Sequence, residues 1–161
     1  MHPRAAALIQ TLGLESHPEG GYFREVFRVE AAVTPEDGRP TRPAMTSIYF
    51  LLTAGDCSRL HRLASDEVWH FYEGAPLDLF CADATLTRVE GLRLGPVEKG
   101  SAPVRTIPAG SWQAARTRGA YTLVGCTVAP GFVFEDFAFL HDDPALADVL
   151  RRHHPDLVPL L

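Results

Sequence analysis

The sequence predicts an all-β fold, either an antiparallel sandwich or a barrel, with one short helix at each end. Glycine and proline occur 13 times each and are spread along all 161 residues. This density of breakers leaves little room for helices but suits short strands joined by turns. Many short strand-like segments follow one another with no helical pattern between them, which is typical of sandwiches and barrels.

Helical patterns are confined to the two ends of the chain. Near the N-terminus, Pro3 suits the first position of a helix and Gly13 suits its C-cap. Near the C-terminus, Asp143 is the predicted N-cap, Pro144 opens the helix, and Pro155 ends it. We therefore expect both helices to lie outside the β region.

The predicted strands form one β core of about residues 20–140 within a single domain that spans 1–161. Their expected ranges are Tyr22–Val29, Thr46–Leu52, Arg59–Leu63, Glu67–Glu73, Leu77–Cys81, Leu86–Leu94, Val104–Ile107, Trp112–Arg116, Tyr121–Val128 and Phe132–Phe139. Thr34–Pro43 contains three prolines and is predicted to be the most mobile loop.

Composition and charge exclude several classes of protein. Hydrophobic residues make up 46% and charged residues 22%, which is ordinary for a globular domain and unlike disordered or coiled-coil chains. The formal net charge of −5 argues against a nucleic-acid partner and against binding to an anionic membrane surface. The first residues lack a secretory pattern, and Cys57, Cys81 and Cys126 have no CxxC spacing. A cytoplasmic protein is expected.

His61 and Glu67 are the central candidate functional residues. Alternation with period two places His61 on one strand face with Arg59 and Leu63. A short turn then brings Glu67 onto the adjacent antiparallel strand, within reach of His61. A carboxylate on an apolar face is costly to bury unless it finds a partner. The simpler alternatives are a hydrogen-bonded structural histidine and a glutamate at the rim of the sheet.

Further candidates share faces with these two residues or lie on a neighbouring strand. Trp69, Phe71 and Glu73 share the face of Glu67, whereas His70 points to the opposite face. Apolar walls with a few polar groups are the general form of a small-ligand site, although aromatic stripes also form ordinary cores. On an earlier strand, Glu25 shares a face with Phe23 and Phe27, and is a second carboxylate in apolar surroundings.

The spacing Gly55-x5-His61-x-Leu63-x3-Glu67-x6-Gly74 resembles the first motif of the cupin superfamily. Four of its five positions are in register, and Leu63 replaces the second histidine of the family. Leu63 also makes the expected pocket drier.

The segment from Ile107 to Gln113 resembles the second cupin motif. Pro108 and Gly110 are in place, and Gln113 stands where the family has a histidine. Longer segments, such as Pro18–Glu25, resemble a cupin subfamily carried as a domain of unknown function, which is similar in fold to the sugar-nucleotide epimerases of rhamnose synthesis. The resemblance implies a jelly roll of two antiparallel sheets, a pocket inside the barrel and a homodimer.

The resemblance also implies two kinds of chemistry at the site. Metal-binding cupins use three histidines and a glutamate, so His61, Glu67 and Gln113 would form a reduced ligand set for Mn, Fe, Ni or Zn. Without a metal, a carboxylate beside His61 would fix its tautomer and leave the other ring nitrogen as a general base. The related epimerases use a histidine of the corresponding strand in this way.

The first expected function is therefore binding of a polar metabolite, such as a sugar or a nucleotide-sugar-like compound, inside the barrel. The expected ligand-binding residues are Glu25, His61, Glu67, Trp69, Phe71 and Gln113. The alternative is an enzyme, either a metal-free isomerase or epimerase with His61 and Glu67 as catalytic residues, or a metal-dependent one. A structural, storage-type cupin is the third reading and would have no cavity large enough for a ligand.

Overall fold

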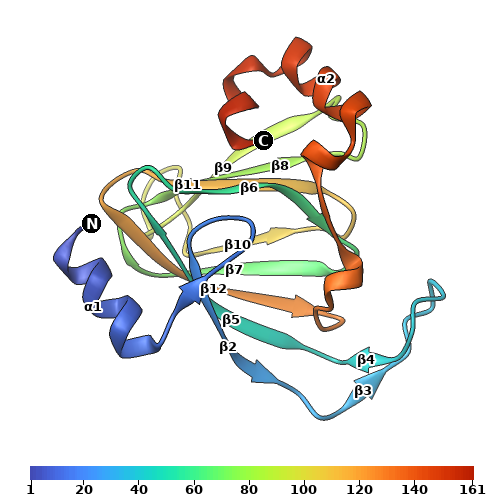
Figure 1. The fold of residues 1–161 in the computed structure, drawn as a ribbon, viewed down its shortest axis with the longest axis horizontal. Helices are drawn as coiled ribbons and strands as arrows, with labels where there is room; N and C mark the ends of the chain where they lie inside the picture. The colour runs from blue at the N-terminus through green and yellow to red at the C-terminus, as the bar shows by residue number, and fades with distance from the viewer.

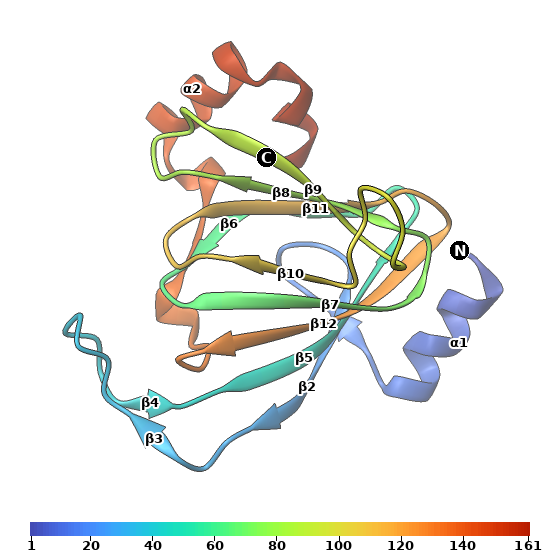
Figure 2. The same ribbon diagram turned by 180° about the vertical axis from the view of Figure 1, so that it is seen from behind.

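Two antiparallel β-sheets pack face to face, as Figures 1 and 2 show from opposite sides. The computed structural model describes residues 1–161. The larger sheet has six strands in the order β1-β2-β5-β12-β7-β10, and the smaller sheet has five in the order β13-β6-β11-β8-β9. The chain crosses repeatedly between the sheets, so that strands far apart in sequence become neighbours. This is the predicted jelly roll, and the fold class is confirmed.

The ten expected strands agree with the structure to within two residues at each end, except that the strand expected from Leu86 begins only at Val89 and the last strand is shortened. In the larger sheet they are β1 Glu15–Ser16, β2 Tyr22–Arg28, β5 Thr46–Thr53, β7 Asp66–Gly74, β10 Val104–Ile107 and β12 Tyr121–Ala129. In the smaller sheet they are β6 Cys57–Leu63, β8 Leu77–Ala82, β9 Val89–Leu94, β11 Trp112–Thr117 and β13 Phe137–Phe139. The expected strand Phe132–Phe139 is wrong over its first half, because Phe134–Asp136 forms a 3-10 turn (η1).

Both predicted helices are confirmed. Helix α1 spans Pro3–Leu12 and ends at Gly13, whose φ of 61° is the left-handed conformation of a glycine C-cap. Helix α2 spans Pro144–His153, and the side chain of Asp143 accepts a hydrogen bond from the Leu146 amide. Two further 3-10 segments, η2 Leu140–Asp142 and η3 Pro155–Leu160, flank it. No helix combines the length and the apolar character needed to cross a membrane.

The helices cover the outer faces of the sheets. In α1, Ala5 and Leu8 pack on Leu51 and Leu123 of the larger sheet. Helix α2 and η3 lie over the smaller sheet, as Figure 1 shows, and bury an apolar cluster that includes Leu60. The interior between the sheets is therefore free to hold the site. A small hairpin, β3 Ala32–Val33 and β4 Arg42–Pro43, extends from the end of the larger sheet.

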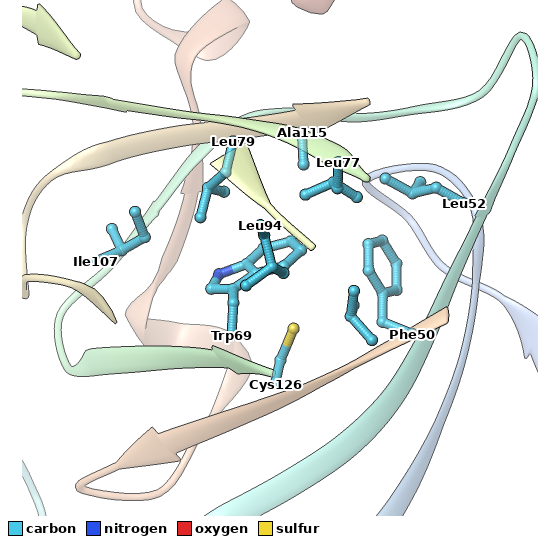
Figure 3. Packing of buried hydrophobic residues seen from close by; sticks show 10 residues of the cluster. Phe50, Leu52, Trp69, Leu77, Leu79, Leu94, Ile107, Ala115 and Cys126 are labelled. Atoms are coloured by element: carbon cyan, nitrogen blue, oxygen red, sulfur yellow. The ribbon is translucent and has the colours of Figure 1, made fainter. Parts of the chain in front are cut away.

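One end of the barrel interior is packed solid. Figure 3 shows Trp69 at its centre, among side chains that include Leu77, Leu79 and Leu94. Full burial of side chains of this size contributes about 2–3 kcal/mol each to folding. Phe50 marks the inner limit of this cluster, because it also borders a cavity at the other end of the barrel. The barrel interior thus has a packed half and an open half.

A register shift in β7 corrects one expected face. The shift lies between the pairs Glu73–Leu123 and Phe71–Val124, so β7 carries one extra residue there. Phe71 keeps the inward face, whereas Glu73 turns outward and binds Arg4 of α1 at 2.7 Å. Glu73 therefore does not share the face of Glu67.

Candidate functional site

A cavity of about 340 Å³ occupies the open end of the barrel. Its wall is mainly apolar and includes five phenylalanines, which are Phe23, Phe50, Phe132, Phe134 and Phe137. It also carries four glutamates, which are Glu19, Glu25, Glu67 and Glu135. An apolar wall with a few polar groups is the usual form of a small-molecule site. A fully plugged interior is thereby excluded.

Glu67 projects from the start of β7 into this cavity and is only 6% exposed. The amide nitrogen of Gln113 donates to its Oε2 atom. Burial, the largest effect, raises the pKa of Glu67 to about 7, while the neighbouring His61 opposes this rise and Glu19 adds to it. Glu67 is therefore a buried acid that gains and loses its proton near neutral pH.

Gln113 holds Glu67 in place rather than facing the cavity. Its Oε1 atom accepts a hydrogen bond of 3.0 Å from the indole nitrogen of Trp69, which fixes the orientation of the amide. The amide NH2 group is consequently the end presented to Glu67. Trp69, Phe71 and Gln113 are not among the residues that line the cavity, which differs from their expected role as ligand-binding residues. They form the packed support behind Glu67.

The three residues expected to bind a metal do not form a ligand set. The carbonyl oxygen of Gln113 is occupied by Trp69, and its amide nitrogen, a donor that cannot ligate a cation, faces Glu67. No group of three or more His, Cys, Asp or Glu side chains has an arrangement suited to a metal ion. These donors do not fit a divalent metal.

His61 is fully enclosed at the wall of the cavity, and both of its ring nitrogens have partners. Its Nδ1 atom lies 2.7 Å from the carbonyl oxygen of Arg59, to which it donates a proton. Its Nε2 atom lies 3.2 Å from Oε2 of Glu19. The carboxylate that contacts the ring is therefore Glu19 and not Glu67, which corrects the expected pairing. Burial lowers the pKa of His61.

The loop before β2 brings Glu19 into the barrel. Glu19 accepts a hydrogen bond of 2.8 Å from the Ser58 hydroxyl, and its backbone carbonyl accepts one of 2.9 Å from the Arg59 amide. The next residue, Gly20, has a φ of 114°, and a Cβ atom there would lie 2.0 Å from the carbonyl oxygen of Cys57. Only glycine allows the loop to approach β6 this closely.

A register shift in β6 makes this contact possible. Between the pairs His61–Gln113 and Ser58–Ala115, β6 has one residue more than β11. This bulge allows both Ser58 and His61 to face inward. Arg59 is exposed as a result, and its expected position on the same face as His61 is wrong. Burial raises the pKa of Glu19.

His17 is a second cavity residue from the same loop. Its Nδ1 atom accepts a hydrogen bond of 3.2 Å from the backbone amide of Glu19, so the neutral ring carries its proton on Nε2. The ring packs edge-on against Phe23 at 4.5 Å between centroids. Sequence reasoning missed both His17 and Glu19. The signal available was the Gly20–Gly21 pair before a strand, which indicates a close backbone approach.

Arg28 and Glu25 form an ion pair at the mouth of the cavity. The guanidinium donates two hydrogen bonds to the carboxylate, at 2.9 and 2.7 Å, and a third of 3.3 Å to the carbonyl of Phe132. Sequence reasoning missed Arg28, because a register shift between Glu25 and Phe27 reverses the expected alternation. Arg28 lines the cavity, while Phe27 points outward and is 49% exposed.

The segment that closes the mouth is anchored by Asp136. Its carboxylate pairs with Arg39 at 2.8 Å and also with the buried Arg42. Arg39 comes from the segment expected to be the most mobile loop and also donates to the Ser65 hydroxyl at 2.9 Å. These contacts tie the loop and the mouth segment to the barrel.

Comparison with known proteins places the chain in a family. A family described as "Cupin superfamily (DUF985)" matches residues 6–140. A protein from Shewanella oneidensis is 33% identical, with a TM-score of 0.83, over 98% of this chain and 96% of that one. A hypothetical protein from Leishmania major is 32% identical, also with a TM-score of 0.83, over 97% of this chain and 96% of that one.

More distant structures share the fold alone. The oxalate decarboxylase of Bacillus subtilis is 17% identical, with a TM-score of 0.60, over 87% of this chain and 34% of that one. A search of curated proteins found no match. With its two-sheet jelly roll, and with a family match over most of its length, the chain belongs to the cupin superfamily and within it to the DUF985 family.

Proposed function

We propose that this protein binds a small polar organic molecule inside the barrel, with Glu67 as its main polar contact. The observation that carries the proposal is a buried carboxyl, with a pKa of about 7, on the wall of a mainly apolar cavity of about 340 Å³. Burying an ionisable group without a charged partner lowers stability. A ligand that hydrogen-bonds to Glu67 would offset this cost.

The wall favours some of the ligands expected from the sequence over others. Its only arginine is Arg28, no lysine lines it, and both oxygens of Glu25 already engage the guanidinium. A nucleotide diphosphate would need free cations or amide-rich loops. The geometry therefore supports a ligand without negative charge more than a nucleotide sugar.

A metal-free proton-transfer enzyme is the second candidate function. A catalytic acid or base works best when its pKa lies near the operating pH, and Glu67 meets this condition. His61 is less available as a base, because Glu19 occupies its Nε2 atom. In an isomerase or epimerase, Glu67 would take a proton from the ligand and the His61–Glu19 pair would stabilise the resulting charge. Deuterium uptake from solvent into candidate sugars, abolished by Glu67→Gln, tests this role.

The binding proposal is tested with three variants and a metabolite panel. Val128 is paired in register with Glu67 and lines the cavity, so Val128→Phe partly fills the cavity. Glu67→Gln removes the charge, and Glu73→Gln makes the same change on the outer face of the same strand. We expect panel members that raise the melting temperature of the wild type to lose this effect with Val128→Phe and Glu67→Gln, but not with Glu73→Gln. Hits unaffected by the cavity variants would place binding elsewhere.

A further inference from the structure

We infer that the cavity selects an organic cation, namely an ammonium group attached to a partly apolar body. This inference rests on the proposed function, because it specifies the class of molecule that the same cavity holds. It is carried by an imbalance of charge on the cavity wall and by the aromatic rings around it.

The imbalance begins at the deep end of the cavity. Nε2 of His61 lies 3.2 Å from Oε2 of Glu19, and burial raises the pKa of this carboxyl. With one proton between the two atoms, the pair is neutral overall whichever atom holds it. His17 accepts a backbone hydrogen bond at Nδ1 and is neutral in that state. Glu67 remains, and no lysine or arginine forms an ion pair with it or with Glu19. Its charge, when present, has no matching cation.

The mouth adds no cation to correct this imbalance. The charge of Arg28 is neutralised by Glu25 through two hydrogen bonds. Glu135 also lines the cavity but is exposed, so solvent screens its charge. The buried charge that a ligand can match is thus that of Glu67. An anionic ligand would be repelled, whereas an ammonium group would supply the missing partner.

The remaining wall suits the rest of such a molecule. Five phenylalanine rings line the cavity, and Phe137 stacks on His61 with 5.1 Å between ring centroids. Aromatic faces carry partial negative charge and attract cations, and they also bury an apolar body. A highly hydroxylated ligand would leave hydroxyl groups against these rings without hydrogen bonds. The aromatic wall and the unmatched carboxylate therefore favour the same class of ligand.

A matched set of three probes tests the inference. Benzylamine, benzyl alcohol and benzoate have the same apolar body but carry a positive, zero and negative charge. Binding is measured by calorimetric titration of the full chain at pH 8, where Glu67 is ionised. We expect benzylamine to bind at least about tenfold more tightly than benzyl alcohol, a difference of about 1.4 kcal/mol. Benzoate should bind most weakly.

The variants assign the preference to Glu67. Glu67→Gln should weaken benzylamine binding about tenfold and change benzyl alcohol binding by less than about twofold. Glu73→Gln, the outer-face control, should change neither. Val128→Phe should weaken the binding of both probes if they occupy the cavity.

The possible failures are distinguishable. If benzyl alcohol binds as tightly as benzylamine and both are excluded by Val128→Phe, the charge inference is overturned while the cavity remains a ligand site. If benzylamine binding is insensitive to both cavity variants, the inference and the proposed function both fail. If benzylamine does not bind at 10 mM, the preference for a cation is wrong. Stoichiometric binding of Zn²⁺ or Mn²⁺ that depends on Glu67 would also overturn it, because a metal would then be the missing cation.

Discussion

The Nε2 atom of His61 lies 3.2 Å from Oε2 of Glu19, and both side chains are buried. His61 comes from β6 and Glu19 from the loop before β2, so the contact joins the two sheets. Because Nδ1 of the ring already donates to the Arg59 carbonyl, one further proton is shared between Nε2 and the carboxyl. Burial raises the pKa of Glu19 and lowers that of His61, and both directions favour a neutral carboxyl that donates to a neutral ring.

Glu19→Gln reproduces this neutral arrangement. The glutamine amide can donate to Nε2 of His61 while its carbonyl accepts from Ser58. We therefore expect its free energy of unfolding at pH 7 to stay within about 1 kcal/mol of the wild type. Glu19→Leu leaves two buried polar groups without partners and should cost about 2–3 kcal/mol. Chemical denaturation measures both. A loss for Glu19→Gln as large as that for Glu19→Leu would contradict the neutral arrangement.

Glu67→Gln should stabilise the protein at high pH. The pKa of Glu67 is about 7 in the folded state and 4.5 when unperturbed. Between these values the folded state binds more protons than the unfolded state, so stability falls as the pH rises through this window and levels off above it. At pH 8 the variant should therefore gain up to about 3 kcal/mol over the wild type. The gain should vanish below about pH 5.

The groups around Glu67 make the comparison with the variant necessary. His61, Glu19 and Cys126 face it from three different elements, and His17 lines the same cavity. Burial lowers the pKa of both histidines, so their contribution to stability is lost as the pH falls below 6.5, opposite in sign to that of Glu67. The difference between wild type and Glu67→Gln isolates the carboxyl. A difference that is flat between pH 5 and pH 8 would refute the raised pKa.

Local sequence patterns predicted the architecture and part of the site. Capping residues are local signals, and Gly13 and Asp143 correctly predicted an end of each helix. Alternation correctly placed His61 and Glu67 inside the barrel, because each is followed by a regularly paired stretch of its strand. Alternation failed after the extra residue near Val26, where Arg28 and not Phe27 faces inward. Such bulges arise from the pairing of whole strands, and no single residue in the sequence predicts them.

The partners within the site depended on long-range contacts that the sequence does not show. Gln113 occupied the position of a family ligand, but the indole of Trp69 orients its amide as a support for Glu67. Glu19 belongs to a loop, and loop conformations depend on the surfaces on which they dock. A carboxylate beside His61 was expected from Glu67 of the neighbouring strand, but Glu19 of the loop before β2 supplies it.

Gly20→Ala should disrupt the site through its backbone. A Cβ atom at this position would lie 2.0 Å from the carbonyl oxygen of Cys57, and the φ of 114° disfavours any side chain. The loop must therefore lift from β6 and carry Glu19 away from His61. We expect a loss of at least about 2 kcal/mol in the free energy of unfolding. Gly55→Ala is the control, because Gly55 also has a positive φ but no atom within 4 Å of the new Cβ. Equal losses in the two variants would mean that the contact with β6 contributes nothing.

The charge of Asp136 should control the mouth of the cavity. Its carboxylate pairs with Arg39 and Arg42, and Arg42 is only 5% exposed, so Asp136→Asn leaves a buried guanidinium without its counter-charge. Breaking a buried ion pair by removing one partner costs about 3–5 kcal/mol. The loss for Asp136→Asn should lie at the lower end of that range, because Asp136 is not fully buried and is shared between two arginines. Asp37→Asn is the matched control, because the Asp37 carboxylate, which also pairs with Arg39, is exposed to solvent and should contribute little to stability. Hydrogen exchange should then accelerate in residues 34–41 and 132–137 of Asp136→Asn, while α2 keeps its protection. Unchanged exchange in the mouth segment would show that the aromatic packing of Phe132 and Phe137 holds it without the ion pairs.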